Sequence, residues 1–207
     1  MALPVLVKDA CHMFSNYIKK VAIVGAGGHM GNAIAQELLK TGKHTITAIT
    51  RAGKNSVFHN GIVKASVDYN DQDSLISALR GQEFLIITLS LSTTPDTHTK
   101  LLNAAAKAGV SYVMPNAYSI YAHNEAIQRD IPITNQVLQN IAEVQKAGLI
   151  SITLMNGFWY EWSLTAGPIA FGFDLKNRVV TLYDDGRKAI NISTWVQAVW
   201  PRSGLFA

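Results

Sequence analysis

The sequence has little of several features that mark particular protein classes. Its 207 residues include one cysteine, Cys11, which excludes an internal disulfide framework and agrees with a reducing cytosol, where we expect a passive thiol. Charged residues make up only 15% of the chain, and no run of five Lys or Arg accompanies its net charge of +4, so direct nucleic-acid binding is not predicted. The chain has neither about 18 consecutive apolar residues nor a signal-peptide core, which predicts a cytoplasmic protein without a membrane partner.

Motifs of several enzyme classes are also missing. The six histidines show no metal-ligand spacing, and with a single cysteine no metal site is predicted. No Gly-x-Ser-x-Gly elbow indicates a hydrolase, and no Tyr-x-x-x-Lys pair indicates the usual short-chain dehydrogenase couple. What remains is a chain with 48% apolar residues, a balance typical of α/β proteins with buried parallel strands.

Short apolar runs alternate with helical patterns along the first three quarters of the chain. We predict strands at 20–25, 45–50, 61–67, 84–89, 111–114 and 149–155. Helices are predicted between the first two strands and at 71–79, 96–108 and 135–147. Right-handed crossovers between such strands predict an α/β fold, a Rossmann-type doubly wound parallel sheet.

The pattern loosens beyond Asn116. A polar stretch covers 118–130, the aromatic run 158–162 is interpreted as loop and lid, and the segments 178–184 and 188–192 predict a hairpin around Asp185-Gly186. A last helix begins near Trp195 and breaks at Pro201. We therefore predict an N-terminal extension at 1–19, an NAD(P)-binding domain at 20–155 and a small, truncated substrate region at 156–207.

A glycine loop lies between the first predicted strand and helix, in the sequence Gly25-Ala-Gly-Gly-His-Met-Gly31. Its spacing fits Gly-x-x-Gly-x-x-Gly, because Met30 stands where a Gly-x-Gly-x-x-Gly motif begun at Gly25 would need a small residue. Gly25 allows the tight turn, Gly28 lets the backbone approach a diphosphate, and Gly31 lets the helix pack on the strand. The loop therefore predicts dinucleotide binding at the helix N-terminus.

The end of the second strand indicates which dinucleotide is bound. An NAD site would place Asp or Glu there to hold the ribose 2′-hydroxyl, whereas this chain has Arg51 and then Lys54. A guanidinium suits a 2′-phosphate through charge-assisted bidentate hydrogen bonds, which predicts NADPH or NADP. Asp68 has two open interpretations: it accepts from the adenine amino group, or it serves a turn or helix cap.

Several further segments accompany the glycine loop: VAIVGAGG at 21–28, LKTGKH at 39–44, TAITR at 47–51, VDY at 67–69, MPN at 114–116, GFWYE at 157–161, GFD at 172–174 and KNR at 176–178. Together they resemble the NmrA-like, isoflavone-reductase-like NADPH-binding proteins, an atypical short-chain dehydrogenase/reductase group, and within it the fungal CipA-like oxidoreductases. The resemblance implies a Rossmann domain, a small C-terminal substrate domain, and NADPH held by the glycine loop and the strand-end arginine.

The motifs and the resemblance together assign a set of site residues. Expected at the cofactor are Gly25, Gly27, Gly28, His29, Met30, Gly31, Arg51, Lys54, Asp68, Ser90, Pro115 and Asn116. Expected at the substrate are Phe158, Trp159 and Tyr160, although such an aromatic run also suits core packing.

The chain departs from the resembled family at its catalytic lysine. The resemblance places that lysine about eleven residues before Gly148, where this chain has Gln136 and Val137, and no lysine occurs between Lys107 and Lys146. The family's acidic residue and glycine after the Pro-Asn pair are replaced by Ala117 and Ser119. We therefore assign the proton-donor role to Tyr118, to Tyr121 or to water, three alternatives that the sequence leaves open.

Two functions fit these observations. The first is an NADPH-dependent oxidoreductase that transfers hydride to a small, aromatic organic substrate. The alternative is a non-catalytic NADP-binding sensor of the NmrA type, which the missing lysine favours. A dihydrodipicolinate-reductase-like enzyme shares the glycine loop, but no downstream His-Lys cluster supports it. The predicted partners are the cofactor and a small-molecule substrate, and the oligomeric state is left open.

Overall fold

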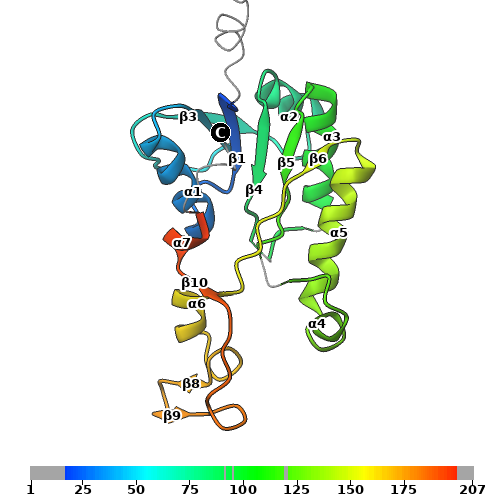
Figure 1. Cartoon of the computed structure of the whole chain (residues 1–207). Helices are drawn as coiled ribbons and strands as arrows, with labels where there is room; N and C mark the ends of the chain where they lie inside the picture. The colour runs from blue at the N-terminus through cyan, green and yellow to red at the C-terminus, as the bar shows by residue number, and fades with distance from the viewer. Residues whose placement is uncertain (1–16, 91, 95, 119–120, 200–207) are drawn as a thin grey trace, which may run out of the picture.

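The computed structural model describes residues 17–90, 92–94, 96–118 and 121–199 (Figure 1). Cys11, Ser119 and Pro201, and with them most of the predicted N-terminal extension, lie outside these residues. In the described part of the chain, no helix is both long and apolar enough to cross a membrane.

Six parallel strands form one sheet in the order β3-β2-β1-β4-β5-β6. These strands are β1 Lys20–Val24, β2 Thr45–Arg51, β3 Ile62–Val67, β4 Phe84–Ile87, β5 Tyr112–Met114 and β6 Ile150–Ser151. The main connecting helices are α1 His29–Lys40, α2 Gln72–Leu79, α3 Asp96–Ala108 and α5 Ile133–Lys146. The predicted Rossmann-type α/β fold is confirmed, because this is the strand order of the dinucleotide-binding class.

Alternating residues of each strand supply two apolar layers, one on each face of the sheet. Ala22 and Val24 of β1 pack in one layer with residues of α2, α3 and α5. Val21 and Ile23 pack in the other layer with residues of α1 and of α7, a short helix at Trp195–Val199. Figure 1 shows the consequence, with α1 and α7 on the left of the sheet and α3 and α5 on the right. Because strands buried on both faces read as continuous apolar runs, they are readily found in the sequence.

Local signals explain the helix boundaries. Met30, Ile34 and Leu38 recur every four residues and form the buried stripe of α1. The side chain of Asp71 caps α2 by accepting from the Asp73 N–H. A helix that the sequence interpretation missed, α4 at Glu125–Asp130, buries none of its residues and so leaves no apolar period to detect.

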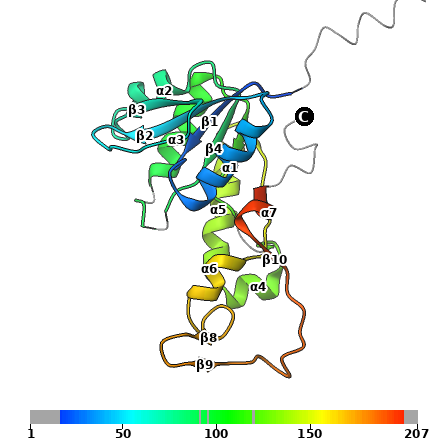
Figure 2. The same cartoon turned by 90° about the vertical axis from the view of Figure 1, so that its left-hand side faces the viewer.

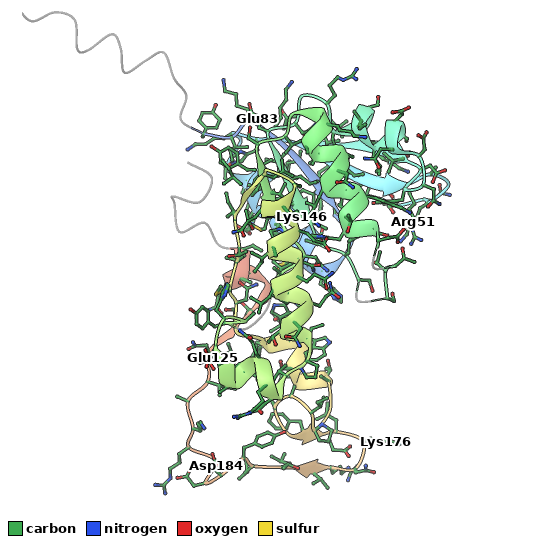
Figure 3. The ribbon with its side chains drawn as sticks, turned by 90° about the vertical axis from the view of Figure 1, so that its right-hand side faces the viewer. Arg51, Glu83, Glu125, Lys146, Lys176 and Asp184 are labelled. Carbon is green, nitrogen blue, oxygen red and sulfur yellow. The ribbon has the colours of Figure 1, made fainter. Side chains whose placement is uncertain are left out.

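The chain beyond β6 forms a separate lobe below the sheet (Figures 1 and 2). The aromatic run 158–162, interpreted as loop and lid, lies instead in β7 Phe158–Trp159 and in the first half of α6 Tyr160–Thr165. Two short strands, β8 Phe173–Asp174 and β9 Val179–Val180, pair antiparallel with each other. A third, β10 Ile192–Ser193, pairs parallel with β7. Figure 3 shows Lys176 and Asp184 at the far end of this lobe. The chain then returns through α7 to contact α1.

Two strand predictions for the last third of the chain are wrong: the hairpin in its pairing and the sixth strand in its length. Asp185-Gly186 does lie in a turn, closed by a 3.0 Å hydrogen bond from the Gly186 N–H to the Tyr183 carbonyl, but the flanking segments do not pair with each other. Residues 182–191 are exposed, so no buried face holds a hairpin there. The sixth strand is also shorter than 149–155, because only Ile150 and Ser151 pair in register with β5, and the contact ends with a 2.9 Å hydrogen bond from the Ile152 N–H to the Val113 carbonyl.

Candidate dinucleotide-binding site

The strand order reverses between β1 and β4, which are hydrogen-bonded neighbours in the sheet. Loops that leave the carboxyl ends of these two strands run to opposite faces, to α1 on one side and α3 on the other. In open α/β sheets, the crevice at such a point is where ligands bind. The glycine loop leaves β1 at this point, as the sequence predicts.

Two glycines of the loop are required by packing. Gly25 has φ +82°, and a Cβ built there would lie 2.1 Å from the Thr88 carbonyl oxygen just after β4. A Cβ at Gly31 would lie 2.3 Å from the Gly25 carbonyl oxygen and 2.6 Å from Thr88 Oγ1. The Thr88 hydroxyl donates to the Val24 carbonyl at 2.7 Å and so fixes this close approach. Gly25 and Gly31 therefore hold β1, β4 and α1 together.

Gly27 and Gly28 face open space instead. A Cβ at Gly28 would approach only the Gly25 carbonyl, at 3.3 Å, and one at Gly27 only Phe58, at 3.8 Å. Gly28 is the N-cap of α1, and neither a side-chain cap nor an acidic residue occupies the first turn. The first amides of the helix thus meet an exposed surface without competing anions, an arrangement that suits a phosphate group.

Arg51 ends β2 at the same edge of the sheet (Figure 3). Its exposed guanidinium has no hydrogen bond or ion pair with the residues that the structure describes. Burial raises the pKa of Tyr69 to about 12, and the charge of Arg51 opposes that rise, which places Arg51 near the end of β3. Lys54 follows in an exposed turn in which its N–H donates to the Arg51 carbonyl at 3.2 Å. The edge therefore carries two exposed cations next to the glycine loop's strand.

Two other residues predicted at the cofactor lie in turns at this edge. Asp68 Oδ1 accepts from the Asn70 N–H at 2.8 Å, so the turn role left open for Asp68 is observed. Ser90 follows β4, and its hydroxyl lies 2.9 Å from that of Ser92. Both residues retain side-chain oxygens at the carboxyl edge of the sheet.

Asn116 links the ends of β4 and β5. Its side chain accepts from the Leu89 N–H and donates to the Leu89 carbonyl, both at 3.1 Å. Asn140 of α5 donates to the Asn116 carbonyl at 2.9 Å, and Gln136 donates to Asn140 Oδ1 at 3.0 Å. Gln136 therefore belongs to a chain of neutral amides that fixes the loops after β4 and β5, with buried Pro115 between them. The sequence interpretation missed Asn140, although a polar residue between Val137 and Val144 on the buried face of α5 is a usable signal.

The two predicted proton donors lie in different environments. Tyr118 is 8% exposed, its hydroxyl has no hydrogen-bond partner among the described residues, and burial raises the pKa of that hydroxyl well above its usual range. Tyr121 is 55% exposed and tilts against His123. Tyr118 thus presents a neutral hydroxyl inside the protein, whereas Tyr121 lies at the surface.

The aromatic run divides between two neighbourhoods. Trp159 packs on Trp195 with ring centroids 4.8 Å apart, in the layer that contains α1. Phe158 and Tyr160 both contact Phe171, with centroids 6.1 and 6.3 Å apart. The structure therefore brings Trp159 toward the sheet and the other two toward the lower lobe. Trp195 and Phe171 were missed because nothing in the local sequence indicates their long-range partners.

Buried polar atoms without a partner concentrate beyond the carboxyl ends of β5 and β6. Seven such side-chain atoms occur among the described residues, and five of them belong to this region: Tyr118 Oη, Ser151 Oγ, Asn156 Nδ2, Trp159 Nε1 and Ser163 Oγ. A buried polar atom without a hydrogen bond costs about 1–3 kcal/mol. This concentration is what a site that binds a polar molecule requires. In the described part of the chain, no group of three or more metal-ligating side chains accompanies it.

A buried pair outside this site predicts how stability depends on pH. His98 of α3 is 5% exposed, and its Nδ1 lies 3.0 Å from Glu143 Oε2 of α5. Burial lowers the pKa of His98, and the hydrogen bond and charge of Glu143 oppose this only in part. The pKa of Glu143 falls as well, because its hydrogen bonds with His98, Thr99 and Gln139 outweigh the effect of its burial.

We expect the free energy of unfolding to fall as the pH drops below 6.5, the ordinary pKa of histidine. Below that value the unfolded chain binds a proton that folded His98 excludes, until the pH passes the lower folded pKa. Denaturant titrations between about pH 8 and pH 5 test this, with His98→Gln expected to flatten the dependence. Replacing the exposed His123 by Gln is the control. Equal slopes for wild type and His98→Gln would contradict the interpretation.

Comparison with known protein families places the chain. The model of the NmrA-like family matches residues 18–146. The chain belongs to the NmrA-like family. That match covers the sheet from β1 through α5 and therefore includes the glycine loop, Arg51 and the Asn116 link.

Two curated proteins to which the chain is similar are named as oxidoreductases. The chain is 28% identical over 172 residues to the oxidoreductase aprR of Aspergillus flavus, covering 81% of this chain and 57% of that protein. It is 29% identical over 155 residues to quinone oxidoreductase 2 of Escherichia coli, covering 72% and 52%. This NmrA-like chain thus spans about half the length of these relatives.

Solved structures agree on the fold. The structure of the E. coli NADPH-dependent quinone oxidoreductase complexed with NADPH superposes with a TM-score of 0.58 and 27% identity, over 73% of this chain and 53% of that one. An isoflavone reductase structure superposes with a TM-score of 0.59 at 16% identity, over 71% and 52%, and shows the fold alone.

Proposed function

We propose that this chain binds NADPH at the carboxyl edge of β1, β2 and β4, and that it reduces a small conjugated acceptor of the quinone type. The observation that carries the proposal is the glycine turn at Gly27 and Gly28, open to solvent and without a capping anion, at the same sheet edge as the unpaired guanidinium of Arg51. An anionic dinucleotide with a 2′-phosphate satisfies both features at once.

In this proposal, different residues of the chain bind different parts of the cofactor. The backbone amides of Gly27, His29 and Met30 hold the diphosphate, because the N-terminus of α1 favours anions and the Gly28 N–H already donates to the Gly25 carbonyl at 2.9 Å. Arg51 takes the 2′-phosphate through charge-assisted bonds, with Lys54 adding positive charge. Ser90, Pro115 and Asn116 line the edge beyond β4 and β5, where the amide chain from Gln136 to Leu89 holds the loops in place.

The reduction needs a hydride, which the nicotinamide supplies, and a proton. Gln136 stands where the resembled reductases carry lysine, and its amide is neutral and already donates to Asn140. Tyr118 offers a buried, protonated hydroxyl that can donate a hydrogen bond to a substrate oxygen. The site therefore positions and polarises an acceptor without containing a strong acid.

A quinone suits such a site for a chemical reason. One hydride reduces a quinone to the anion of a hydroquinone, which is a phenolate whose conjugate acid has a pKa near that of tyrosine, about 10. That anion takes its proton from water after the transfer. Simple aldehydes yield a far more basic alkoxide and depend on a protein acid, whose contribution is about 10²–10⁴ in rate.

The relatives support the proposal. The E. coli protein is named as an NADPH-dependent quinone oxidoreductase, and the Aspergillus flavus protein is named as an oxidoreductase. Trp159, Trp195 and the unpaired buried atoms beyond β5 and β6 provide the aromatic and polar surfaces that a planar carbonyl compound needs.

Acceptor specificity tests the enzymatic part. We expect the protein to oxidise NADPH with quinones at least about 100-fold faster than with unconjugated aldehydes, because only the latter require the missing acid. The decrease in nicotinamide absorbance is the measurement. Tight NADPH binding without oxidation by any acceptor would contradict the proposal and indicate a sensor.

Two tyrosine variants identify the donor in the same assay. Tyr118→Phe is expected to slow quinone reduction about 10-fold while preserving or raising the thermal stability, because it removes a buried hydroxyl without a partner. Tyr121→Phe is the matched comparison at the surface. A larger loss in Tyr121→Phe than in Tyr118→Phe would assign the role to Tyr121 instead.

A further inference from the structure

The short helix α7 returns from the lower lobe to the glycine-loop helix. Ala198 and Val199 of α7 are buried in the same apolar layer as Met30 and Ile34 of α1. Figure 2 shows α7 beside the lower end of α1, where the glycine loop begins. The segment after β6 thus contacts the loop that the proposed function assigns to the diphosphate.

Trp195, the first residue of α7, contacts that loop directly. Its indole stacks on the imidazole of His29, with ring centroids 5.5 Å apart and planes inclined by 29°. The same indole also packs against Trp159, with centroids 4.8 Å apart and planes inclined by 51°. His29 follows Gly28 and is the first residue of α1, so this stack joins α7 to the helix N-terminus.

The position of Trp195 is itself fixed. Both carboxylate oxygens of Glu161 accept from its backbone N–H at 3.2 Å. Thr194 and Gln197 form a reciprocal capping box, in which the Thr194 N–H donates to Gln197 Oε1 and the Gln197 N–H donates to Thr194 Oγ1, both at 3.1 Å. Ser193 anchors the preceding strand through a 2.7 Å hydrogen bond to the Asn156 carbonyl. These hydrogen bonds fix the backbone around Trp195 and thereby restrict the position of its indole.

The position of the His29 side chain depends on this contact with Trp195. It follows two consecutive glycines, which leave the backbone with more freedom than any other residue type. Among the residues that the structure describes, its imidazole makes no hydrogen bond and stacks on one ring alone, that of Trp195. No side chain caps this helix end, so the stack on Trp195 is the contact that restrains the His29 side chain, one residue before the buried Met30.

We infer that Trp195 is a positioning residue for the dinucleotide: through His29 it holds the first amides of α1 in the arrangement that binds the diphosphate. The inference rests on the proposed function, because it concerns the same loop. It makes a distinct prediction from the role of Arg51. The diphosphate is common to NADPH and NADH, so the loss of Trp195 weakens both alike.

A double-mutant cycle between His29 and Trp195 tests the inference. NADPH and NADH are titrated into wild type, Trp195→Ala, His29→Ala and the double variant, with calorimetric detection. Each single variant is expected to bind both dinucleotides about 3- to 10-fold more weakly, which corresponds to one aromatic pair. The double variant is expected to be no weaker than the weaker single variant, because both remove the same contact.

Two further variants separate positioning from general stability. Trp195→Phe retains a ring for the stack and is expected to recover most of the affinity. Trp162→Ala removes a half-exposed tryptophan of α6 and is expected to leave the affinity unchanged. Hydrogen exchange at the His29, Met30 and Gly31 amides is expected to quicken in Trp195→Ala and in His29→Ala, the latter removing an exposed side chain from an otherwise intact fold.

The outcomes distinguish the two proposals. Wild type that binds neither dinucleotide overturns the proposed function, and this inference with it. Wild type that binds, together with unchanged affinity in His29→Ala and Trp195→Ala, overturns this inference alone. Strictly additive losses in the double variant also overturn it, since they assign the two side chains independent effects.

Discussion

Gly25→Ala is expected to destabilise the protein by at least about 3 kcal/mol. A left-handed backbone costs a non-glycine residue about 1–2 kcal/mol. In addition, the new methyl group would lie 2.1 Å from the Thr88 carbonyl, a backbone atom that cannot move aside without disturbing β4. Chemical denaturation measures the loss. Gly42→Ala is the matched control, because Gly42 has φ +65° but nothing within 4 Å of its built Cβ, so it carries the backbone cost alone.

Gly28→Ala is expected to separate binding from folding in the same loop. Gly28 has φ −85°, and its built Cβ approaches only the Gly25 carbonyl at 3.3 Å, so the variant should lose no more than about 1 kcal/mol of stability. The methyl group would nevertheless occupy the surface that we assign to the diphosphate. We expect at least about a 10-fold loss of NADPH affinity. Unchanged affinity in a folded Gly28→Ala would contradict that assignment.

Arg51→Ala is expected to weaken NADPH binding by about 1–3 kcal/mol, or roughly 5- to 150-fold, while NADH binding stays the same. The guanidinium has no partner in the described part of the chain, so its removal disturbs no internal contact of the fold. Arg51→Lys is expected to recover part of the loss, since it retains the charge but not the planar fork.

Parallel titrations of the two dinucleotides measure this effect. Arg80→Ala removes another exposed arginine, at the C-cap of α2, and serves as the control for net charge. Equal losses for NADPH and NADH in Arg51→Ala would show that the side chain does not select the 2′-phosphate. A loss of the same size in Arg80→Ala would show that only the overall charge matters.

The strands of the sheet could be predicted because the burial of each strand leaves a pattern in that strand's own sequence. β1, β2 and β4 are buried on both faces; β1 after its first residue and β4 are continuous apolar runs, and β2 combines apolar residues with threonines up to Arg51. The helix between β1 and β2 carries an apolar stripe at Met30, Ile34 and Leu38. Burial thus determines both the sequence pattern and the element.

The strands of the lobe after β6 were harder to predict, because they lack the burial that leaves such a pattern. Its strands are two residues long and mostly exposed, so pairing is decided by partners far away in the sequence. Asp185-Gly186 carries the local signal of a hairpin turn, yet β9 pairs with β8 and β10 pairs with β7. A turn signal alone cannot select a strand partner when neither flank is buried.

The residues of the candidate site likewise fall into those that the sequence indicates and those that only the structure reveals. The glycines and Arg51 could be found from spacing, because a strand, a tight turn and a helix must follow one another. Thr88 and Trp195 could not, because each acts on the loop from another element, whereas Asn140 left only the weaker signal of a polar residue on a buried helix face. Gln136 shows the limit of comparison by position: in the structure its amide donates to Asn140, and Asn140 in turn donates to the Asn116 carbonyl after β5.

Calorimetric titration of folded wild-type protein with NADPH and with NADH tests the central claim most directly. We predict saturable binding of NADPH, with a higher affinity than for NADH, because amides at the end of α1 hold the diphosphate and Arg51 holds the additional phosphate. Absence of binding heat with both dinucleotides, or tighter binding of NADH, would contradict the account.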